Sequence, residues 1–366
     1  MTLVFMFPGQ SSRYPGMLDK LARLHPRADE VLAQACEALG RDLRSHYSED
    51  NPGAFERNVD VQLGVFIANH MMLSILQAEG VDADLSLGLS LGEYNHLTHI
   101  GALDFLDALR LVKARGEAYD AGPRGFMASV QPLDLGTLEE VVAAVRARGL
   151  GVLEIVNLNS PRQHVLSGEQ AAVEAAVAIL EDEHYVVPAI IERQVPMHAS
   201  IFAPVGEALR PHLRRARFRT ARRPYLPNRV GAPVLAATHD DYVAMLTAHV
   251  HTPVLWRRSI EHVVAVHPDA VLVEVGPRQV LFNLLDRKWV ARPRYCTDSR
   301  DDAAGHLAGV LAALRAHRPA TASATVPGPM SGSMSGSMSG PMAGSMAGPM
   351  PAPMSGSLEV REWPQA

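Results

Sequence analysis

Residues 84–94 read Asp-Leu-Ser-Leu-Gly-Leu-Ser-Leu-Gly-Glu-Tyr, and this stretch decides the fold. Its apolar start predicts a strand over 84–87, and the helical pattern behind it predicts a helix over 91–101. Between the two stands a G-x-S-x-G motif with Ser90 at its centre. A tight strand-to-helix turn needs small residues on both sides of the serine, because the backbone crowds itself there. Such a turn projects the hydroxyl at the positive end of a helix, so we expect Ser90 to be a nucleophile.

The same alternation of strand and helix continues on both sides of this motif. An apolar strand over 3–6 leads into the loop Phe7-Pro8-Gly9-Gln10, and helical patterns follow over 27–39 and 60–79. A further helix is predicted over 104–119. Strands that alternate with helices indicate a parallel sheet covered by helices.

Residues 124–192 follow a different order, βαββαβ, which is the ferredoxin-like pattern. Its strands are predicted at 126–130, 152–157, 163–167 and 184–191, and its helices at 136–148 and 169–182. We therefore expect an α/β fold with two parts. An α/β-hydrolase-like large subdomain with a parallel sheet comprises 1–123 and 193–318, and a ferredoxin-like small subdomain over 124–192 is inserted into it. Ligands usually bind in the cleft between such parts.

The composition narrows the class of protein. The chain has 366 residues, 47% of them hydrophobic, and a formal net charge of −5. No run of Lys and Arg lies beside interleaved aromatics, and no stretch approaches ~20 uninterrupted apolar residues, so we expect neither nucleic-acid nor membrane binding. Two distant cysteines and the lack of a signal peptide predict a cytoplasmic protein, with a monomer as the default. From Pro319 a Met/Ser/Gly/Pro repeat predicts a disordered tail over 319–366.

A serine hydroxyl needs a neighbouring base, and the chain has 16 histidines from which to supply one. His96 and His99, and likewise His249 and His251, have spacings that could ligate a metal, but no carboxylate or cysteine completes a set. We expect these four to be surface or capping residues, and we expect no metal. His198 differs because it stands where the chain leaves the inserted subdomain, so it can face the cleft.

Eight sequence blocks then follow one another in the order typical of one family. They are FPGQ at 7–10, VQLGVF around Gln62, GLSLGEY at 88–94, LVKARG at 111–116, NLNSP at 157–161, PMH at 196–198, TPV at 252–254 and EVGP at 274–277. Over residues 3 to about 285 the chain resembles the malonyl-CoA:acyl carrier protein transacylases and the related polyketide synthase acyltransferases, specifically their stand-alone, trans-acting type.

The resemblance implies a role for each matching residue. Ser90 would attack a thioester and carry the acyl group as an ester, while His198 would move the protons. In this family a backbone carbonyl orients the histidine, here near Thr252. The backbone N–H groups of Gln10 and Leu91 would form the oxyanion hole. No cofactor is implied beyond the coenzyme A thioester, which is a substrate.

Arg115 is the residue that indicates which acyl group is transferred. Its plain interpretation is an exposed arginine near a helix C-terminus, where the helix dipole favours it. The resemblance instead places it where malonyl-using members bind the free carboxylate through two hydrogen bonds. Malonyl-CoA is then the expected donor and an acyl carrier protein the acceptor. The resemblance assigns further residues to the substrate pocket, namely Gln62, Leu89, Tyr119 and Met197, of which Leu89 and Tyr119 depart from the usual histidine and methionine.

Other functions on the same scaffold stay open. One is an editing hydrolase that releases acyl groups from carrier proteins, although Arg115 argues against it because stalled chains carry no free carboxylate at that end. Others are a transferase for a non-malonyl group and a catalytically idle module that docks a carrier protein. Carrier proteins are acidic, so a basic docking surface is expected, with Arg214-Arg215-Ala216-Arg217 and Arg222-Arg223 as candidates.

Overall fold

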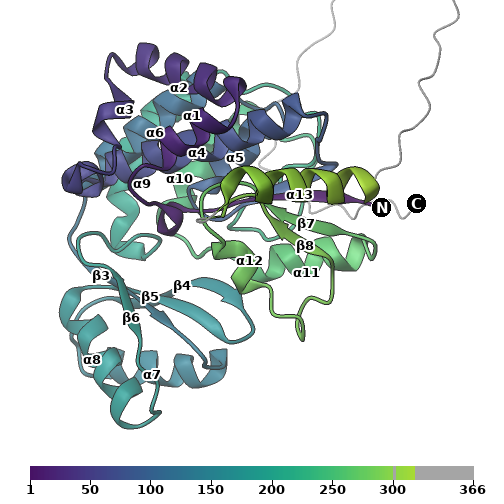
Figure 1. Ribbon diagram of the computed structural model, residues 1–366. Coiled ribbons are helices and arrows are strands. Elements are labelled where there is room, and N and C mark those ends of the chain that lie inside the picture. Colours follow the sequence, from purple (N-terminus) through teal and green to yellow (C-terminus); the bar gives the residue numbers. More distant parts are fainter. Residues whose placement is uncertain (300–301, 318–366) are drawn as a thin grey trace, which may run out of the picture.

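The computed structural model describes residues 1–299 and 302–317 (Figure 1). Within them the chain forms two parts, a larger one with many helices and a smaller one around its own sheet. The expected α/β fold with a parallel sheet and a separate antiparallel sheet is confirmed. The tail predicted over 319–366 lies outside the described residues.

The sheet of the larger part is parallel throughout and has the strand order β2-β1-β7-β8. Its strands are β1 (Leu3–Phe7), β2 (Leu85–Gly88), β7 (Val271–Glu274) and β8 (Arg294–Cys296). All five residues of β1 are buried, as expected for a central strand covered on both faces. Leu3, Phe5 and Phe7 face one core, and Val4 and Met6 face another.

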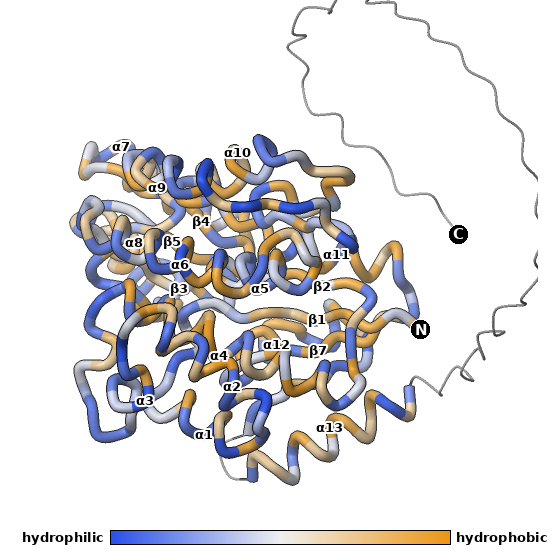
Figure 2. The backbone as a smooth tube through the Cα atoms, turned by 90° about the horizontal axis from the view of Figure 1, so that it is seen from above, coloured by the Kyte–Doolittle hydropathy of each residue, from blue (hydrophilic) through white to orange (hydrophobic). Residues whose placement is uncertain are grey.

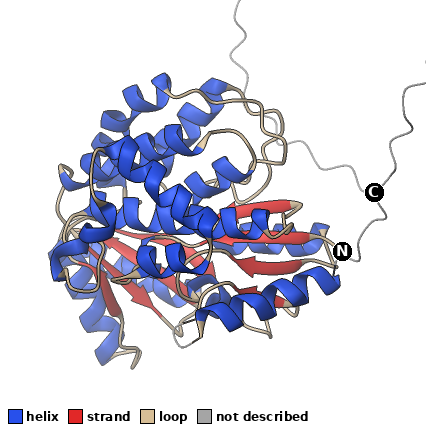
Figure 3. Ribbon diagram, turned by 45° about the horizontal axis from the view of Figure 1, so that its top comes forward, coloured by secondary structure: helices blue, strands red, loops and turns tan. Residues whose placement is uncertain are grey.

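Helices cover both faces of this sheet, as Figure 3 shows. Those that pack into the core of Leu3, Phe5 and Phe7 are α1 (Met17–Leu24), α2 (Pro26–Leu39), α4 (Asn58–Ala78), α5 (Gly92–His99), α6 (Phe105–Asp120), α9 (Ala203–Arg215), α10 (His239–His249) and α13 (Ala303–His317). The other face is covered by α11 (Trp256–Val266) and α12 (Val280–Leu284). A short helix, α3 (Leu43–His46), and the turns η1 (Gln10–Ser12), η2 (Pro52–Phe55) and η3 (Ser200–Phe202) join these elements.

Helix α4 lies at the centre of the helical layer. It packs between α2 and α6, and its 21 residues are apolar enough to pass a length and composition test for a membrane span. In the described part of the chain it is the one helix that does so, and 94% of its apolar window is buried inside the protein. Figure 2 shows the same hydrophobic segment at the interior, with hydrophilic segments toward the outside. Its apolar character is therefore that of a core helix.

The smaller part is an antiparallel sheet of order β4-β5-β3-β6, the ferredoxin-like arrangement predicted from the βαββαβ pattern. Its strands are β3 (Phe126–Val130), β4 (Leu153–Ser160), β5 (Gln163–Gly168) and β6 (Ala189–Glu192), and its helices are α7 (Leu135–Ala147) and α8 (Gln170–Asp182). Ala128, Val130 and Leu166 pack toward these helices, which Figure 1 shows on the side away from the larger part.

Strand β6 is shorter than predicted. The sequence predicted a strand over 184–191, but the structure has one only over Ala189–Glu192. Tyr185 has a φ of 55°, outside the extended region, and Pro188 cannot donate to a ladder. These two residues confine the strand to the last part of the apolar run.

The glycines of the G-x-S-x-G turn make contacts that exclude any side chain. A Cβ on Gly92 would lie 2.1 Å from the carbonyl oxygen of Phe7, and one on Gly88 would lie 2.0 Å from that of Gly92. We predict that Gly92→Ala lowers the free energy of unfolding by about 3 kcal/mol or more, the upper end of overpacking costs. Denaturant unfolding measures this.

Gly309→Ala is the matched control, because nothing lies within 4 Å of a Cβ at that position in α13. Removing a helical glycine there should stabilise the protein by up to about 1 kcal/mol. Equal effects of the two substitutions would contradict the steric argument.

Candidate active site

Ser90 stands between the end of β2 at Gly88 and the start of α5 at Gly92, on the tight turn that the motif predicts. Its φ is 50°, a left-handed conformation that is rare for a residue with a side chain. The conformation points the Ser90 hydroxyl out of the turn and toward His198. The Ser90 Oγ lies 2.8 Å from His198 Nε2.

His198 is buried and is held at both its backbone and its ring. Its N–H donates to the carbonyl of Val250 at 3.0 Å, and its φ of 65° is also left-handed. The ring Nδ1 lies 2.8 Å from the carbonyl oxygen of His249. This contact leaves Nε2 free to face Ser90 as an acceptor, the tautomer that a general base needs.

The carbonyl that orients His198 thus belongs to His249, three residues before the predicted Thr252. Thr252 is also close, because its backbone together with that of His249 raises the pKa of His198. The hydroxyl of Thr252 donates to the carbonyl of Ala248 at 2.9 Å and stabilises the end of α10. The predicted segment near Thr252 therefore supplies the orienting carbonyl, and the shortest contact comes from His249.

The pKa of His198 is lowered from 6.5 to about 3, first because the ring is buried and next because Arg115 is close by. Burial disfavours the charged imidazolium, and the guanidinium repels it. The two backbone carbonyls work in the opposite direction but do not outweigh these effects. His198 is therefore neutral at physiological pH.

Arg115 is 1% exposed, which overturns its plain interpretation as a surface arginine. Its NH1 donates to Gln62 Oε1 at 2.6 Å, and its guanidinium carbon lies 4.3 Å from the centre of the Tyr119 ring. Its NH2 lies 3.5 Å from Ser90 Oγ. Helices α4 and α6 hold these residues, since Gln62 belongs to the first and Arg115 and Tyr119 to the second.

The Arg115 guanidinium has no carboxylate partner among the described residues. Its Nε and the Nε2 of Gln62 are both buried without a hydrogen-bond partner in that same part of the chain. A buried cation without a counterion is costly. Donors left free around one charge are suited to binding an anion beside Ser90.

Two backbone N–H groups near the serine are also free. Within residues 1–299 and 302–317, the N–H groups of Gln10 and Leu91 donate to no backbone or side-chain acceptor. Gln10 begins η1 in the loop after β1, and Leu91 is the N-cap residue of α5. The N–H of Ser90 itself is engaged, because it donates to Asn228 Oδ1 at 2.7 Å.

A cavity of about 380 Å³ opens at Ser90 and His198. One wall is the face of the antiparallel sheet that points away from α7 and α8, and the other comes from the loops after β1 and β2 and from α12. Leu89 and Met197 lie on its lining with Gln10, whereas the cavity does not reach Gln62, Arg115 or Tyr119. The cleft predicted between the two parts is therefore present. Arg115 does not line it, although its NH2 is 3.5 Å from Ser90 Oγ.

Comparisons with known proteins agree with this geometry. Residues 4–292 match the model of the acyl transferase domain family. The chain belongs to that family. It is 32% identical over 286 residues to the malonyl CoA-acyl carrier protein transacylase of Escherichia coli K12, covering 77% of this chain and 91% of the relative.

Solved structures of acyl transferases superpose over nearly their whole length. One is the malonyl CoA-acyl carrier protein transacylase of Clostridium perfringens, with a TM-score of 0.77 and 27% identity over 87% of this chain and 98% of that one. Another is a malonyl-transacylase in complex with a type II polyketide synthase acyl-carrier protein, with a TM-score of 0.77 and 27% identity over 86% and 100%. The family resemblance inferred from the sequence blocks is confirmed.

Four histidines of this acyl transferase, His96, His99, His249 and His251, were expected to be surface or capping residues, and three of them are buried. His96, His99 and His249 are all at most 2% exposed. His96 and His99 both contact Ser86 Oγ through Nδ1, at 2.7 and 2.8 Å. They lie on the inner face of α5, which the short sequence window did not reveal.

The arginines considered for carrier docking do not line the cavity at Ser90. Arg223 pairs with Asp82 Oδ2 at 2.5 Å, and Asp82 precedes β2 whereas Ser90 follows it. Arg214, Arg215 and Arg217 are exposed at the end of α9. Arg223 therefore lies toward the opposite end of β2 from Ser90.

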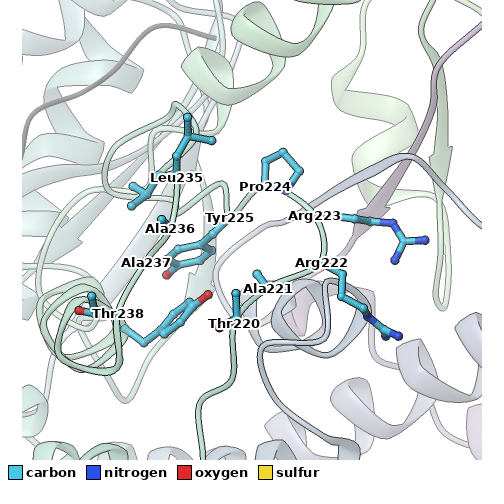
Figure 4. Close-up of a pocket in the computed structure, with 12 residues that line it drawn as sticks. Thr220, Ala221, Arg222, Arg223, Pro224, Tyr225, Leu235, Ala236, Ala237 and Thr238 are labelled. Carbon is cyan, nitrogen blue, oxygen red and sulfur yellow. The ribbon is translucent and has the colours of Figure 1, made fainter. Parts of the chain in front are cut away.

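A larger cavity, of about 480 Å³, lies elsewhere in the acyl transferase (Figure 4). Thr220–Tyr225 and Val234–Thr238 line it together with Tyr242. Figure 4 shows the side chains of Arg222 and Arg223 extending away from it. Neither Ser90 nor His198 lines it, so the cavity at these two residues is not the larger of the two.

Sequence reasoning missed Asn228 and the role of Glu93. Asn228 contacts Ser90 across 138 residues, and no motif marks it. Glu93 stands inside the GLSLGEY block, is 1% exposed and accepts from the hydroxyl of Tyr225 at 2.5 Å. Burial raises the pKa of Glu93 to about 7, against the hydrogen bonds from Tyr225 and Asn228, which lower it.

The low pKa of His198 can be tested directly. We predict that the His198 ring stays neutral at pH 5 in the native protein, as followed by nitrogen NMR of labelled imidazole. Arg115→Ala should raise this pKa, because it removes the repulsion, yet leave it below 6.5, because burial remains.

Arg110→Ala is the control for this titration. Arg110 lies on the same helix but is exposed and pairs with Asp107, so its removal should leave the titration of His198 in place. A His198 that titrates near 6.5 in the unmodified protein would refute the account.

Proposed function

We propose that this acyl transferase moves a malonyl group from coenzyme A to the phosphopantetheine thiol of an acyl carrier protein through an acyl ester on Ser90. The observation that carries the proposal is the buried Arg115 guanidinium, unpaired among the described residues and 3.5 Å from the Oγ that contacts His198. It supports an acyl group that brings its own carboxylate. The names of the relatives and of the carrier-bound neighbour support the donor and the acceptor.

The first half-reaction forms the ester. Neutral His198 accepts the Ser90 proton at Nε2 while Oγ attacks the thioester carbonyl, and the N–H groups of Gln10 and Leu91 hold the oxyanion. The C–S bond then breaks, and the imidazolium gives its proton to the departing coenzyme A thiolate. Losing one oxyanion donor typically costs about 3 kcal/mol of transition-state stabilisation.

The second half-reaction reverses the roles. His198 takes the proton of the carrier thiol, the thiolate attacks the Ser90 ester, and Ser90 Oγ leaves with the proton from the imidazolium. One site thus serves both half-reactions in turn, which is ping-pong transfer. We propose that no cofactor takes part, because Ser90 itself carries the acyl group, and that the enzyme acts as a cytoplasmic monomer.

Arg115 links selectivity to proton transfer. Its charge helps to hold the pKa of His198 far below the ordinary range. A malonyl carboxylate bound at Arg115 would neutralise that charge and raise the pKa of His198 toward a value better suited to a base. An acetyl group brings no such charge, so it lacks both the ion pair and this activation.

The two half-reactions give a decisive test of the proposed function. The protein is incubated with malonyl-CoA, and mass spectrometry should find one malonyl group on Ser90 that leaves only when carrier protein is added. Release of free malonate at the same rate without carrier would favour the editing hydrolase. No adduct with any acyl thioester would favour the docking module.

Substitution of Arg115 separates malonyl from other acyl groups. We predict that Arg115→Ala lowers malonyl transfer at least about a hundredfold, because a buried charge pair loses one partner, while acetyl transfer is equal or improved. Rates with malonyl-CoA and acetyl-CoA measure this, with Arg110→Ala as the exposed control on the same helix. An equal loss for both thioesters would mean that Arg115 has only a structural role.

A further inference from the structure

The left-handed conformation of Ser90 requires support from outside the turn. Its φ of 50° is unfavourable for a residue with a Cβ, and such residues persist only where the surroundings fix them. The two glycines permit the turn but do not impose it, since glycine is flexible. The contacts that fix Ser90 must come from another segment.

Asn228 makes these contacts. Its side-chain Oδ1 accepts the N–H of Ser90 at 2.7 Å, and its Nδ2 donates to the carbonyl of Gly88 at 2.6 Å. One amide group thus bridges the backbone on both sides of Leu89. Asn228 is only 2% exposed, so water does not compete for these hydrogen bonds.

Asn228 is itself held in place, and one of the residues that hold it, Glu93, lies directly after the same turn. Its backbone N–H donates to Glu93 Oε2 at 2.9 Å, and its carbonyl accepts the N–H of Leu255 at 2.8 Å. Glu93 Oε1 accepts from the hydroxyl of Tyr225 at 2.5 Å. The segment from Tyr225 to Asn228 therefore holds both ends of the turn, the serine through an amide and the start of α5 through a carboxyl group.

We propose that Asn228, held by Glu93 and Tyr225, is a positioning residue that fixes the Ser90 nucleophile against His198 and the free N–H groups of Gln10 and Leu91. The proposal rests on the proposed function for its reaction, but the placement of Oγ can be measured without it. An asparagine side chain supplies an acceptor and a donor in one plane at this length, which the turn requires. An aspartate keeps the acceptor but opposes an oxygen to the Gly88 carbonyl.

The effect on reactivity should be large, since misplacing a reacting group by about 1 Å can cost about a hundredfold in rate. We expect Asn228→Ala to slow the labelling of Ser90 by a fluorophosphonate about a hundredfold. In that reaction Oγ forms a bond to phosphorus and fluoride leaves, so malonyl-CoA plays no part. The KM for malonyl-CoA should change less than about threefold, because the polar groups of Asn228 are all engaged by the turn, Glu93 and Leu255.

Tyr225→Phe and Tyr242→Phe form a matched pair. Both remove one buried phenol hydroxyl, and the two rings lie 5.2 Å apart. The hydroxyl of Tyr225 contacts Glu93, whereas that of Tyr242 has no partner within the described ranges. Tyr225→Phe should slow labelling of Ser90 roughly tenfold, and Tyr242→Phe should leave it unchanged. Asn228→Asp should fall between the native protein and Asn228→Ala.

Thermal unfolding is recorded for every variant, and labelling is measured where each is folded. Native labelling rates in Asn228→Ala would overturn the proposal, as would equal losses in the two tyrosine variants. If Asn228→Ala fails to fold, Asn228→Asp and the tyrosine pair decide the question by the same criterion. Normal labelling of Ser90 without any malonyl adduct would refute the proposed function and leave the positioning role intact.

Discussion

The backbone turn between β2 and α5 has no room for a side chain at Gly88 or Gly92, and this steric constraint governs where Ser90 stands. The chain reverses within a few residues there, and Ser90 takes a left-handed φ while the side chain of Asn228 hydrogen-bonds to the backbone on both sides of Leu89. His198 reaches the serine from the return of the chain after the antiparallel sheet, with a left-handed φ of its own. Two unusual backbone conformations, in segments far apart along the chain, thus meet at one hydrogen bond.

The site has a buried positive charge that no carboxylate of the described residues pairs with. The one buried cation, among the described residues, that lies beside Ser90 is Arg115, and it faces a histidine oriented by a carbonyl rather than by a carboxylate. Glu93, the nearby buried acid, is occupied by Tyr225 and Asn228. The residues of the site therefore leave the charge of Arg115 without a carboxylate partner, and under the proposed function the substrate supplies one.

The sequence could predict the features that depend on residues close together along the chain. The G-x-S-x-G turn, the strands around it and the βαββαβ insertion follow from spacing and periodicity over short windows, and the structure confirms this architecture. Contacts between distant segments could not be predicted in this way. The sequence indicated only the segment near Thr252, not the carbonyl of His249 itself. Asn228 carries no motif, and the burial of His96 and His99 depends on helices that pack only in the folded chain.

The carbonyl of His249 behind His198 has a consequence for the choice of acceptor. A neutral oxygen orients the ring but lends it little basicity, in contrast to the aspartate of hydrolytic triads. A weak base can ionise a thiol, whose pKa is about 8.5, far more readily than water, whose pKa is about 15.7. Under the proposed function, the more acidic carrier thiol then attacks the ester on Ser90 faster than water does. The ester therefore resists hydrolysis until a carrier protein binds.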